Sequence, residues 1–329
     1  MCHCSIGSSH PLRVAVFGVG AIGGYFGGTL ARTGHDVNFI ARGDTAAALR
    51  RRGLRIEGGT GDFLVHPAQV FEDSARVGPV ELVILGVKAW QVAEVGPMLK
   101  PMLCEDSAVL PLQNGVGTTN ELVKVLDRRH VLGGVCRIFC SQVAPGHVRH
   151  EGANPWIGLG ELDNRASKRV ESLQKAFEAA GVNTEVPEDI HATIWSKFLF
   201  IASVSSVGAA ERVAIGKLRT EARTRRLLID SMKEIETLAR QLGVALADDV
   251  IASTLDFVDS LPADNMPSMQ RDLMEARPSE LEAQLGTVIQ LAEAASLDLP
   301  VNRTLYALLF PQSLPAPPAN AGALPPDGP

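Results

Sequence analysis

The sequence predicts a two-part α/β fold, with a doubly wound parallel sheet in the N-terminal half and an all-helical domain in the C-terminal half. Three observations predict it. Up to about residue 135, short apolar runs alternate with helical patterns, as they do in doubly wound sheets. The first apolar run leads directly into a glycine-rich turn. Beyond Pro187 the strand patterns stop, and the segments up to Phe310 have helical periodicity.

Buried parallel strands are expected where apolar and β-branched residues run together without alternation. They fall at residues 12–17, 36–41, 81–87, 107–112 and 130–135, with helices at 21–33, 90–98 and 116–126. Between 138 and 160, alternating pieces with glycines predict antiparallel strands added to this sheet, before a helix at 165–180 and a strand at 182–186. In the C-terminal half, helices are expected at 189–210, 220–242, 247–261, 278–296 and 302–310.

These elements divide the chain of 329 residues into four segments. The sheet domain is expected over residues 12–187 and the helical domain over 188–310, each long enough for a core of its own. Disordered tails are expected at 1–11 and at 311–329, the second because it is rich in proline and alanine.

Composition places the chain among soluble globular proteins, with 46% hydrophobic and 21% charged residues. A net charge of −6 without a basic cluster argues against nucleic acid as a partner. The longest apolar stretch, residues 198–210, is too short to span a membrane. Five cysteines without a disulfide framework, and no secretory signal, predict a cytoplasmic location. Cys2-His3-Cys4 lacks a second cysteine pair, so no metal site is expected, and the apolar helix faces are compatible with a homodimer.

The glycine-rich turn has the spacing of a dinucleotide-binding loop. Gly18, Gly20 and Gly23 follow the first strand and open a helix. In such loops the first glycine permits the tight turn, the second admits the pyrophosphate, and the third lets the helix pack on the strand. The spacing alone also occurs in ordinary turns, but here both flanking elements are present. We therefore expect a Rossmann-type domain whose loop binds the cofactor through Gly18, Val19, Gly20, Ala21, Ile22 and Gly23.

The second strand indicates which nicotinamide cofactor this loop would serve. An NAD site usually has Asp or Glu at the end of that strand to hold the ribose 2′-hydroxyl. Here Ala41-Arg42-Gly43 stand at that end, and Asp36 lies at the opposite one. Arg42 can grip a 2′-phosphate, with no carboxylate beside it to repel that phosphate. NADP(H) is therefore favoured, the alternative being a solvated arginine in a turn.

Reduction of a ketone needs a proton donor, and Lys197 is the first candidate. It lies in an apolar helical segment, where desolvation would lower the pKa of an ammonium group towards neutrality. Ser205, eight residues on, falls on roughly the same helix face. Alternatively, Lys197 extends to the surface.

Two further segments offer polar groups for substrate or cofactor. Asn114 and Lys88 each follow a strand, at the carboxyl edge where ligands bind in parallel sheets. The alternative for Gln113-Asn114-Gly115 is a turn chosen for its backbone geometry. Ser268 and Glu280 could bind substrate, or they could merely cap and stabilise the first turn of a helix, which for Glu280 begins after Pro278.

Together these segments, from about Arg13 to Phe310, resemble the ketopantoate reductase family (2-dehydropantoate 2-reductases). The similarity rests on the loop Gly18 to Gly24, Arg42, Val87-Lys88-Ala89, Gln113-Asn114-Gly115, Trp195-x-Lys197 and Pro267-Ser268-Met269-x-x-Asp272 followed by Glu280. The resemblance implies that Lys197 and Glu280 are catalytic and that Asn114, Ser205 and Ser268 bind substrate. It also implies that Arg42, Lys88, Asn114 and Glu280 contact the cofactor.

One departure from the family matters for the substrate. Better-known members have asparagines one and two turns after the lysine, where this chain has Ile201 and Ser205. The resemblance implies NADPH-dependent reduction of a 2-oxo acid to a 2-hydroxy acid, with 2-dehydropantoate, the precursor of (R)-pantoate in pantothenate biosynthesis, as the first candidate. The alternatives are a related 2-oxo acid or hydroxyacid reductase, and a non-catalytic NADPH sensor.

Overall fold

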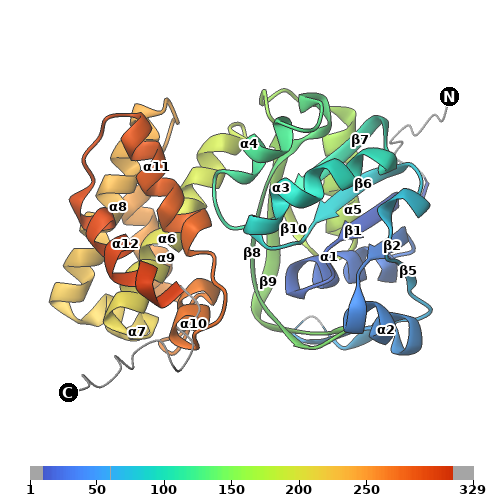
Figure 1. Cartoon of the computed structure of the whole chain (residues 1–329), viewed down its shortest axis with the longest axis horizontal. Helices are drawn as coiled ribbons and strands as arrows, with labels where there is room; N and C mark the ends of the chain where they lie inside the picture. Colours follow the sequence, from blue (N-terminus) through green and yellow to red (C-terminus); the bar gives the residue numbers. More distant parts are fainter. Residues whose placement is uncertain (1–9, 60, 314–329) are drawn as a thin grey trace, which may run out of the picture. The chain divides into compact units, whose positions relative to one another are not determined.

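The computed structural model describes residues 10–59 and 61–313, which form two compact units (Figure 1). Unit 1 runs to Phe198 and includes Gly243–Ala247, and unit 2 comprises Leu199–Leu242 and the chain from Asp248 onward. The division falls inside helix α6 (Ile190–Glu211), eleven residues beyond the boundary at Pro187 that the sequence suggested. The first turn of α6 packs on the rest of unit 1. Ile190 lies so close to Gly133 that a Cβ atom at Gly133 would be 2.5 Å from Ile190 Cγ1.

The expected terminal tails lie mostly outside the described residues, as does Cys2-His3-Cys4. Where the structure does describe the end of the chain, it differs from expectation. Helix α12 (Pro300–Ser313) continues past Phe310 through Pro311, so the last helix ends three residues beyond the end that its sequence pattern indicated.

A five-stranded parallel sheet forms the centre of unit 1. Its strands are β1 (Arg13–Phe17), β2 (Asp36–Ile40), β5 (Gln69–Phe71), β6 (Val80–Leu85) and β7 (Leu103–Pro111), in the order β5-β2-β1-β6-β7. All neighbouring strands are parallel. The reversal of strand order beside β1 places the loops after β1 and β6 at the edge where ligands bind in such sheets. The predicted doubly wound sheet is confirmed.

Helices cover both faces of this sheet. Helix α1 (Ala21–Arg32) packs on β1 and β2, with Phe26 and Leu30 fully buried in the core. The opposite face is covered by α3 (Val92–Val95), the 3₁₀ segment Gly96–Met102 and α4 (Thr118–Val123), around a second cluster that includes Val83, Leu85 and Leu99. Helix α2 (Gly43–Arg52) connects β2 to the strands beyond it.

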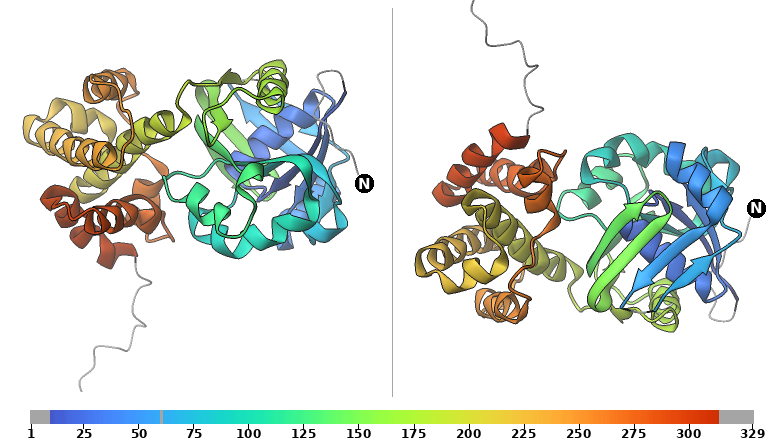
Figure 2. Two further views of the ribbon diagram at one scale, coloured as in Figure 1. Left: turned by 90° about the horizontal axis from the view of Figure 1, so that it is seen from above. Right: turned by 90° about the horizontal axis from the view of Figure 1, so that it is seen from below.

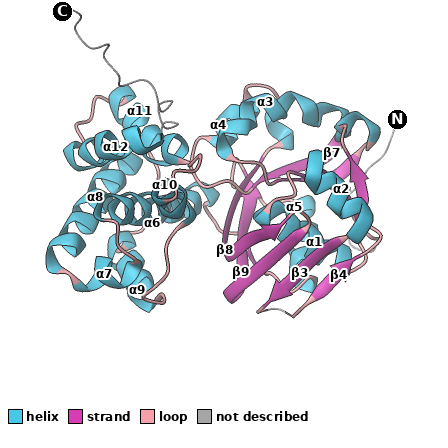
Figure 3. Ribbon diagram, turned by 60° about the horizontal axis from the view of Figure 1, so that its bottom comes forward, coloured by secondary structure: helices cyan, strands magenta, loops and turns pink. Residues whose placement is uncertain are grey.

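A second sheet lies against the far side of α1 (Figure 3). It contains β3 (Leu54–Gly58), β4 (Phe63–Val65), β8 (Leu132–Ala144), β9 (His147–Glu161) and β10 (Asn183–Glu185). Glycine lets α1 approach this sheet closely. At Gly28, for example, a Cβ atom would lie only 3.2 Å from Leu54 Cδ2. Helix α5 (Lys168–Ala179) also contacts β9 and β10.

This second sheet corrects two expectations from the sequence. The segment at 130–135 was expected to be a parallel strand of the central sheet, but β8 pairs antiparallel with β9, and only Val131 bridges to Val109 of β7. The pieces between 138 and 160 were expected as additions to the central sheet. They instead form one long hairpin turned at Gly146, which lies beside β3 (Figure 2, right). Alternating polarity indicates a strand but not the sheet that it joins.

Within the described residues, the regular elements of unit 2 are all helices, as predicted. After α6 come α7 (Ile215–Thr220), α8 (Ala222–Gln241), α9 (Val250–Ser260) and α10 (Ser268–Met274). A π-helical turn, Glu282–Gly286, then leads into α11 (Thr287–Ala294) and α12. The short helix α7 was not expected from the sequence pattern, and α10 was expected only as the helix start that Ser268 could cap. Among the described residues α6 is long and apolar enough to cross a membrane, but 61% of its most apolar window is buried in the protein, as expected of a core helix.

Candidate functional site

The three glycines after β1 have the geometry that a dinucleotide loop requires. Gly18 has a φ of +95°, and a Cβ there would lie 2.7 Å from the backbone nitrogen of Val87. A Cβ at Gly23 would lie 2.1 Å from the carbonyl oxygen of Gly18, so this position needs a bare backbone. A Cβ at Gly20 would meet no described atom within 4 Å. The first and third glycines thus serve the fold, whereas the second leaves space beside the loop.

The same loop presents the beginning of a helix. Gly20 is the N-cap of α1, no side chain caps the helix, and its first turn has no acidic residue. The first intrahelical bond is donated by Gly24 to Gly20 at 2.9 Å, so the amides of Ala21, Ile22 and Gly23 are not used by the helix. These amides and the helix dipole favour an anion. The loop therefore fits the pyrophosphate of a dinucleotide.

Arg42 follows β2 and is the N-cap residue of α2. It borders a cavity of about 350 Å³ with Phe17, Ser74 and Met98, and its Nη2 atom lies 3.7 Å from the Met98 sulfur. Glu72 and Asp73 border this cavity too. The expectation that no carboxylate accompanies Arg42 is therefore wrong for the folded chain. That expectation considered only the residues at the end of β2, whereas the carboxylates of Glu72 and Asp73 follow the end of β5.

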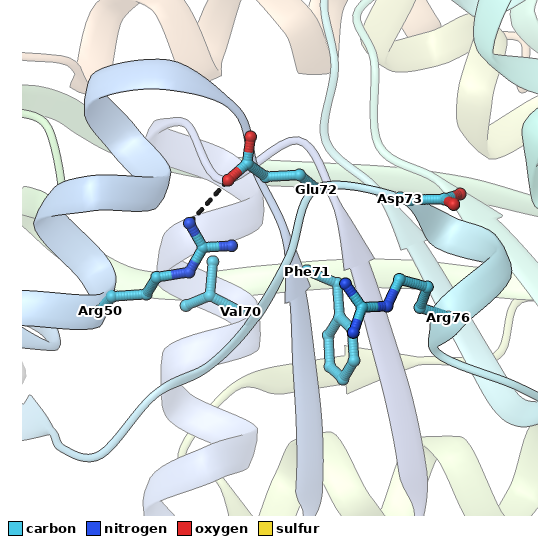
Figure 4. A pocket seen from close by; sticks show the side chains of 6 residues that line it. All are labelled: Arg50, Val70, Phe71, Glu72, Asp73 and Arg76. Atoms are coloured by element: carbon cyan, nitrogen blue, oxygen red, sulfur yellow. Dashed lines mark hydrogen bonds and ion pairs between the residues drawn. The ribbon is translucent and has the colours of Figure 1, made fainter.

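A neighbouring cavity of about 490 Å³ shares Glu72 and Asp73 and is shown in Figure 4. It is lined by Arg50, Val70, Phe71, Glu72, Asp73 and Arg76. Arg50 Nη1 lies 2.6 Å from Glu72 Oε1, and Asp73 accepts a hydrogen bond of 2.9 Å from the Ala75 amide. Both carboxylates are thus engaged by partners. Arg50 lies eight residues after Arg42, about two helical turns further along α2.

The carboxyl edge of the central sheet holds two of the predicted residues in contact. Gln113 Nε2 donates to the carbonyls of Leu85 (2.8 Å) and Val87 (3.0 Å), which ties the loop after β7 to the loop after β6. Beside it, Asn114 Oδ1 accepts a hydrogen bond of 2.6 Å from Lys197 Nζ. The half-buried Lys197 therefore turns to an amide at the ligand edge of the sheet.

Lys88, at the end of β6, belongs to the same edge. Its ammonium lies 5.7 Å from the centre of the exposed Trp90 ring, and its backbone nitrogen donates to Gln91 Oε1 at 3.1 Å. The negative face of an aromatic ring attracts a cation held beside it in this way.

The remaining candidates lie in unit 2. Ser205, on α6, is fully buried, and its hydroxyl has no hydrogen-bond partner among the described residues. Ser268 is the first residue of α10 and is half-buried. Glu280 immediately precedes the helical segment that contains the π-turn and is only 6% exposed. Asp272, by contrast, pairs with Arg277 at 2.9 Å, which is a structural role.

Comparisons with known proteins identify the family of this chain. Residues 14–164 match the family Ketopantoate reductase PanE/ApbA, and residues 189–311 match Ketopantoate reductase PanE/ApbA C terminal. The chain belongs to the ketopantoate reductase family. It is thus an oxidoreductase acting on a CH–OH group of a small molecule, from a family of pyridine-nucleotide-dependent reductases. The resemblance seen in the sequence is confirmed.

Individual relatives match over almost their whole length. A 2-dehydropantoate 2-reductase from Nostoc sp. is 28% identical over 299 residues, covering 89% of this chain and 93% of that protein. The crystal structure of 2-dehydropantoate 2-reductase from Geobacter metallireducens superimposes with a TM-score of 0.85 at 29% identity, covering 91% and 99%. D-mandelate dehydrogenase with NADH and anilino(oxo)acetate has a TM-score of 0.82 at 21% identity, covering 91% and 98%, and shares the fold.

Proposed function

We propose that the protein reduces a 2-oxo acid to the 2-hydroxy acid with NADPH, and that 2-dehydropantoate is its substrate, giving (R)-pantoate for pantothenate biosynthesis. The observation that supports this most directly is the 2.6 Å hydrogen bond between Lys197 and Asn114 at the carboxyl edge of the sheet. When bound, the reduced nicotinamide supplies a hydride to the ketone carbon. The ketone oxygen then needs one proton, so that one 2-oxo acid, one NADPH and one proton give one 2-hydroxy acid and one NADP⁺.

The chain's own residues supply the proton and hold the substrate. Lys197 donates the proton to the ketone oxygen, and Asn114 orients that ammonium through its Oδ1 atom. Ser268 and Ser205 donate hydrogen bonds to substrate oxygens. Glu280, a buried carboxylate, accepts a hydrogen bond from a hydroxyl group.

The cofactor preference rests on Arg42. Its guanidinium would form charge-assisted hydrogen bonds to the 2′-phosphate of NADPH. The Glu72 carboxylate on the same cavity would oppose that phosphate, but its ion pair with Arg50 offsets the negative charge. The preference for NADPH therefore depends on Arg42 directly and on Arg50 through Glu72.

Replacing Arg42 with alanine is expected to weaken NADPH binding by about 10- to 100-fold, since a hydrogen bond to a charged group contributes about 1.5–3 kcal/mol. NADH has no 2′-phosphate, so its affinity should stay within about threefold. Fluorescence titration of both nucleotides measures this. Arg76→Ala, on the neighbouring cavity, is the matched control. Equal weakening of NADPH and NADH by Arg42→Ala would exclude the phosphate role.

The activity itself is tested by following NADPH oxidation with a panel of 2-oxo acids. We expect turnover with 2-dehydropantoate. Because Ile201 offers no polar group where relatives have an amide, less polar 2-oxo acids should also be reduced, at a cost in kcat/KM of less than about 100-fold. Tight NADPH binding without turnover of any 2-oxo acid would contradict the proposal and indicate a nucleotide sensor.

A further inference from the structure

The π-helical turn that follows Glu280 contains a fully buried amide. Gln284 is 0% exposed, and neither its Oε1 nor its Nε2 atom has a hydrogen-bond partner in the described part of the chain. Burying an unpaired amide is costly, so such groups in native proteins call for a specific explanation. A π-helical turn is itself rare and is found frequently at functional sites.

The opposite side of the turn is held in place by α12. Glu282 Oε1 accepts a hydrogen bond of 2.6 Å from the Tyr306 hydroxyl, and burial together with this carboxylate raises the pKa of Tyr306 to about 12. Glu282 and Gln284 are two residues apart and therefore lie on roughly opposite sides of the helix. Anchoring Glu282 at the surface thus directs Gln284 into the interior of unit 2.

Other unpaired polar atoms gather on the same stretch. Within the described residues, the hydroxyl of Ser279 is buried without a partner, and it directly precedes the 6%-exposed Glu280. The backbone nitrogen of Gln284 donates to the Glu280 carbonyl at 2.9 Å, so the two residues are one turn apart. Three unpaired atoms therefore flank the carboxylate already proposed to bind a hydroxyl group.

We propose that Gln284 is a substrate-binding residue, since α6 itself has no amide at Ile201 or Ser205. This inference rests on the proposed function. A primary amide is satisfied only by a ligand that offers both an acceptor and a donor. Its Nε2 donates to a substrate oxygen, and its Oε1 accepts from a substrate hydroxyl. A 2-oxo acid with a hydroxyl group on its side chain should therefore bind more tightly than one with an alkyl side chain alone.

The test compares Gln284→Leu with the wild-type protein on two substrates, 2-dehydropantoate and 3,3-dimethyl-2-oxobutanoate, which lacks the hydroxyl group. We expect KM for 2-dehydropantoate to rise by about 5- to 150-fold, with kcat within about threefold. KM for the alkyl acid should change by less than threefold. The thermal midpoint of the free protein should not fall, because leucine removes an unpaired buried amide.

Asn302→Leu is the matched control. Asn302 is also fully buried in unit 2, but its amide is satisfied, since Nδ2 donates to Glu234 Oε2 at 2.8 Å and Oδ1 accepts from Ser231 at 2.9 Å. This variant should lower the thermal midpoint and leave both KM values unchanged. If Gln284→Leu behaves like Asn302→Leu, the amide is structural and the inference is overturned.

A second readout separates this inference from the proposed function. If the wild-type protein turns over neither acid, the proposed function fails. The rise in thermal midpoint caused by 2-dehydropantoate in the presence of NADP⁺ then still reports on Gln284. Loss of that rise in Gln284→Leu supports the substrate contact, and an undiminished rise, or no rise in the wild-type protein, overturns it.

Discussion

Replacing Lys197 with alanine is expected to lower kcat by about 10²- to 10⁴-fold, the range that a positioned general acid contributes. The ammonium lies 2.6 Å from Asn114 Oδ1 at the edge where the sheet binds ligands, so alanine removes the proton donor without disturbing the glycine loop. NADPH affinity should therefore stay within about threefold. Single-turnover measurements of NADPH oxidation with 2-dehydropantoate give the rate of the chemical step, and fluorescence titration gives the affinity.

Two controls make this result specific. Lys168→Ala removes an exposed lysine from the first turn of α5 and should leave both quantities unchanged. Lys197→Arg keeps the positive charge but replaces the compact ammonium with a guanidinium that does not release its proton. It should therefore be as slow as the alanine variant. A kcat of wild-type magnitude in Lys197→Ala would remove this residue from the mechanism, whatever the activity of the arginine variant.

The sequence was most informative where one local pattern determines one structure. Strand, glycine loop and helix follow each other within 13–32, and the more distant residues that contact the loop, Ile40, Gly86 and Val87, come from the ends of the two neighbouring strands. The partners of β8 could not be predicted this way. Its alternation shows that one face is buried, whereas its pairing with β9 and exclusion from the central sheet depend on distant strands.

Contacts between side chains that are far apart in the sequence could not be predicted either. Lys197 and Asn114 were both candidates, but their hydrogen bond spans 83 positions of the chain. Arg50 and Glu72 are 22 positions apart in the chain, and only the fold places them on one cavity as an ion pair. Gln284 lay unremarked within a helical pattern, because nothing in that pattern shows that a buried amide will lack a partner.

The glycine loop supports a second large effect, in which two neighbouring positions should fail in different ways. A Cβ at Gly23 would lie 2.1 Å from the Gly18 carbonyl oxygen, so Gly23→Ala forces α1 away from β1. We expect a loss of about 1–3 kcal/mol in the free energy of unfolding, as for other overpacked sites, together with loss of NADPH binding by more than about tenfold. Denaturant unfolding and fluorescence titration measure the two quantities.

Gly20→Ala should separate cofactor binding from stability. Gly20 has a φ of −87°, which alanine tolerates, and a Cβ there meets nothing within 4 Å in the described structure. The free energy of unfolding should therefore change by no more than about 1 kcal/mol. The methyl group would nevertheless occupy the space through which a pyrophosphate must approach the first amides of α1, so NADPH affinity should fall by more than about tenfold. Wild-type affinity in Gly20→Ala would place the nucleotide elsewhere, because no other glycine of the loop leaves room for a phosphate beside the beginning of the helix.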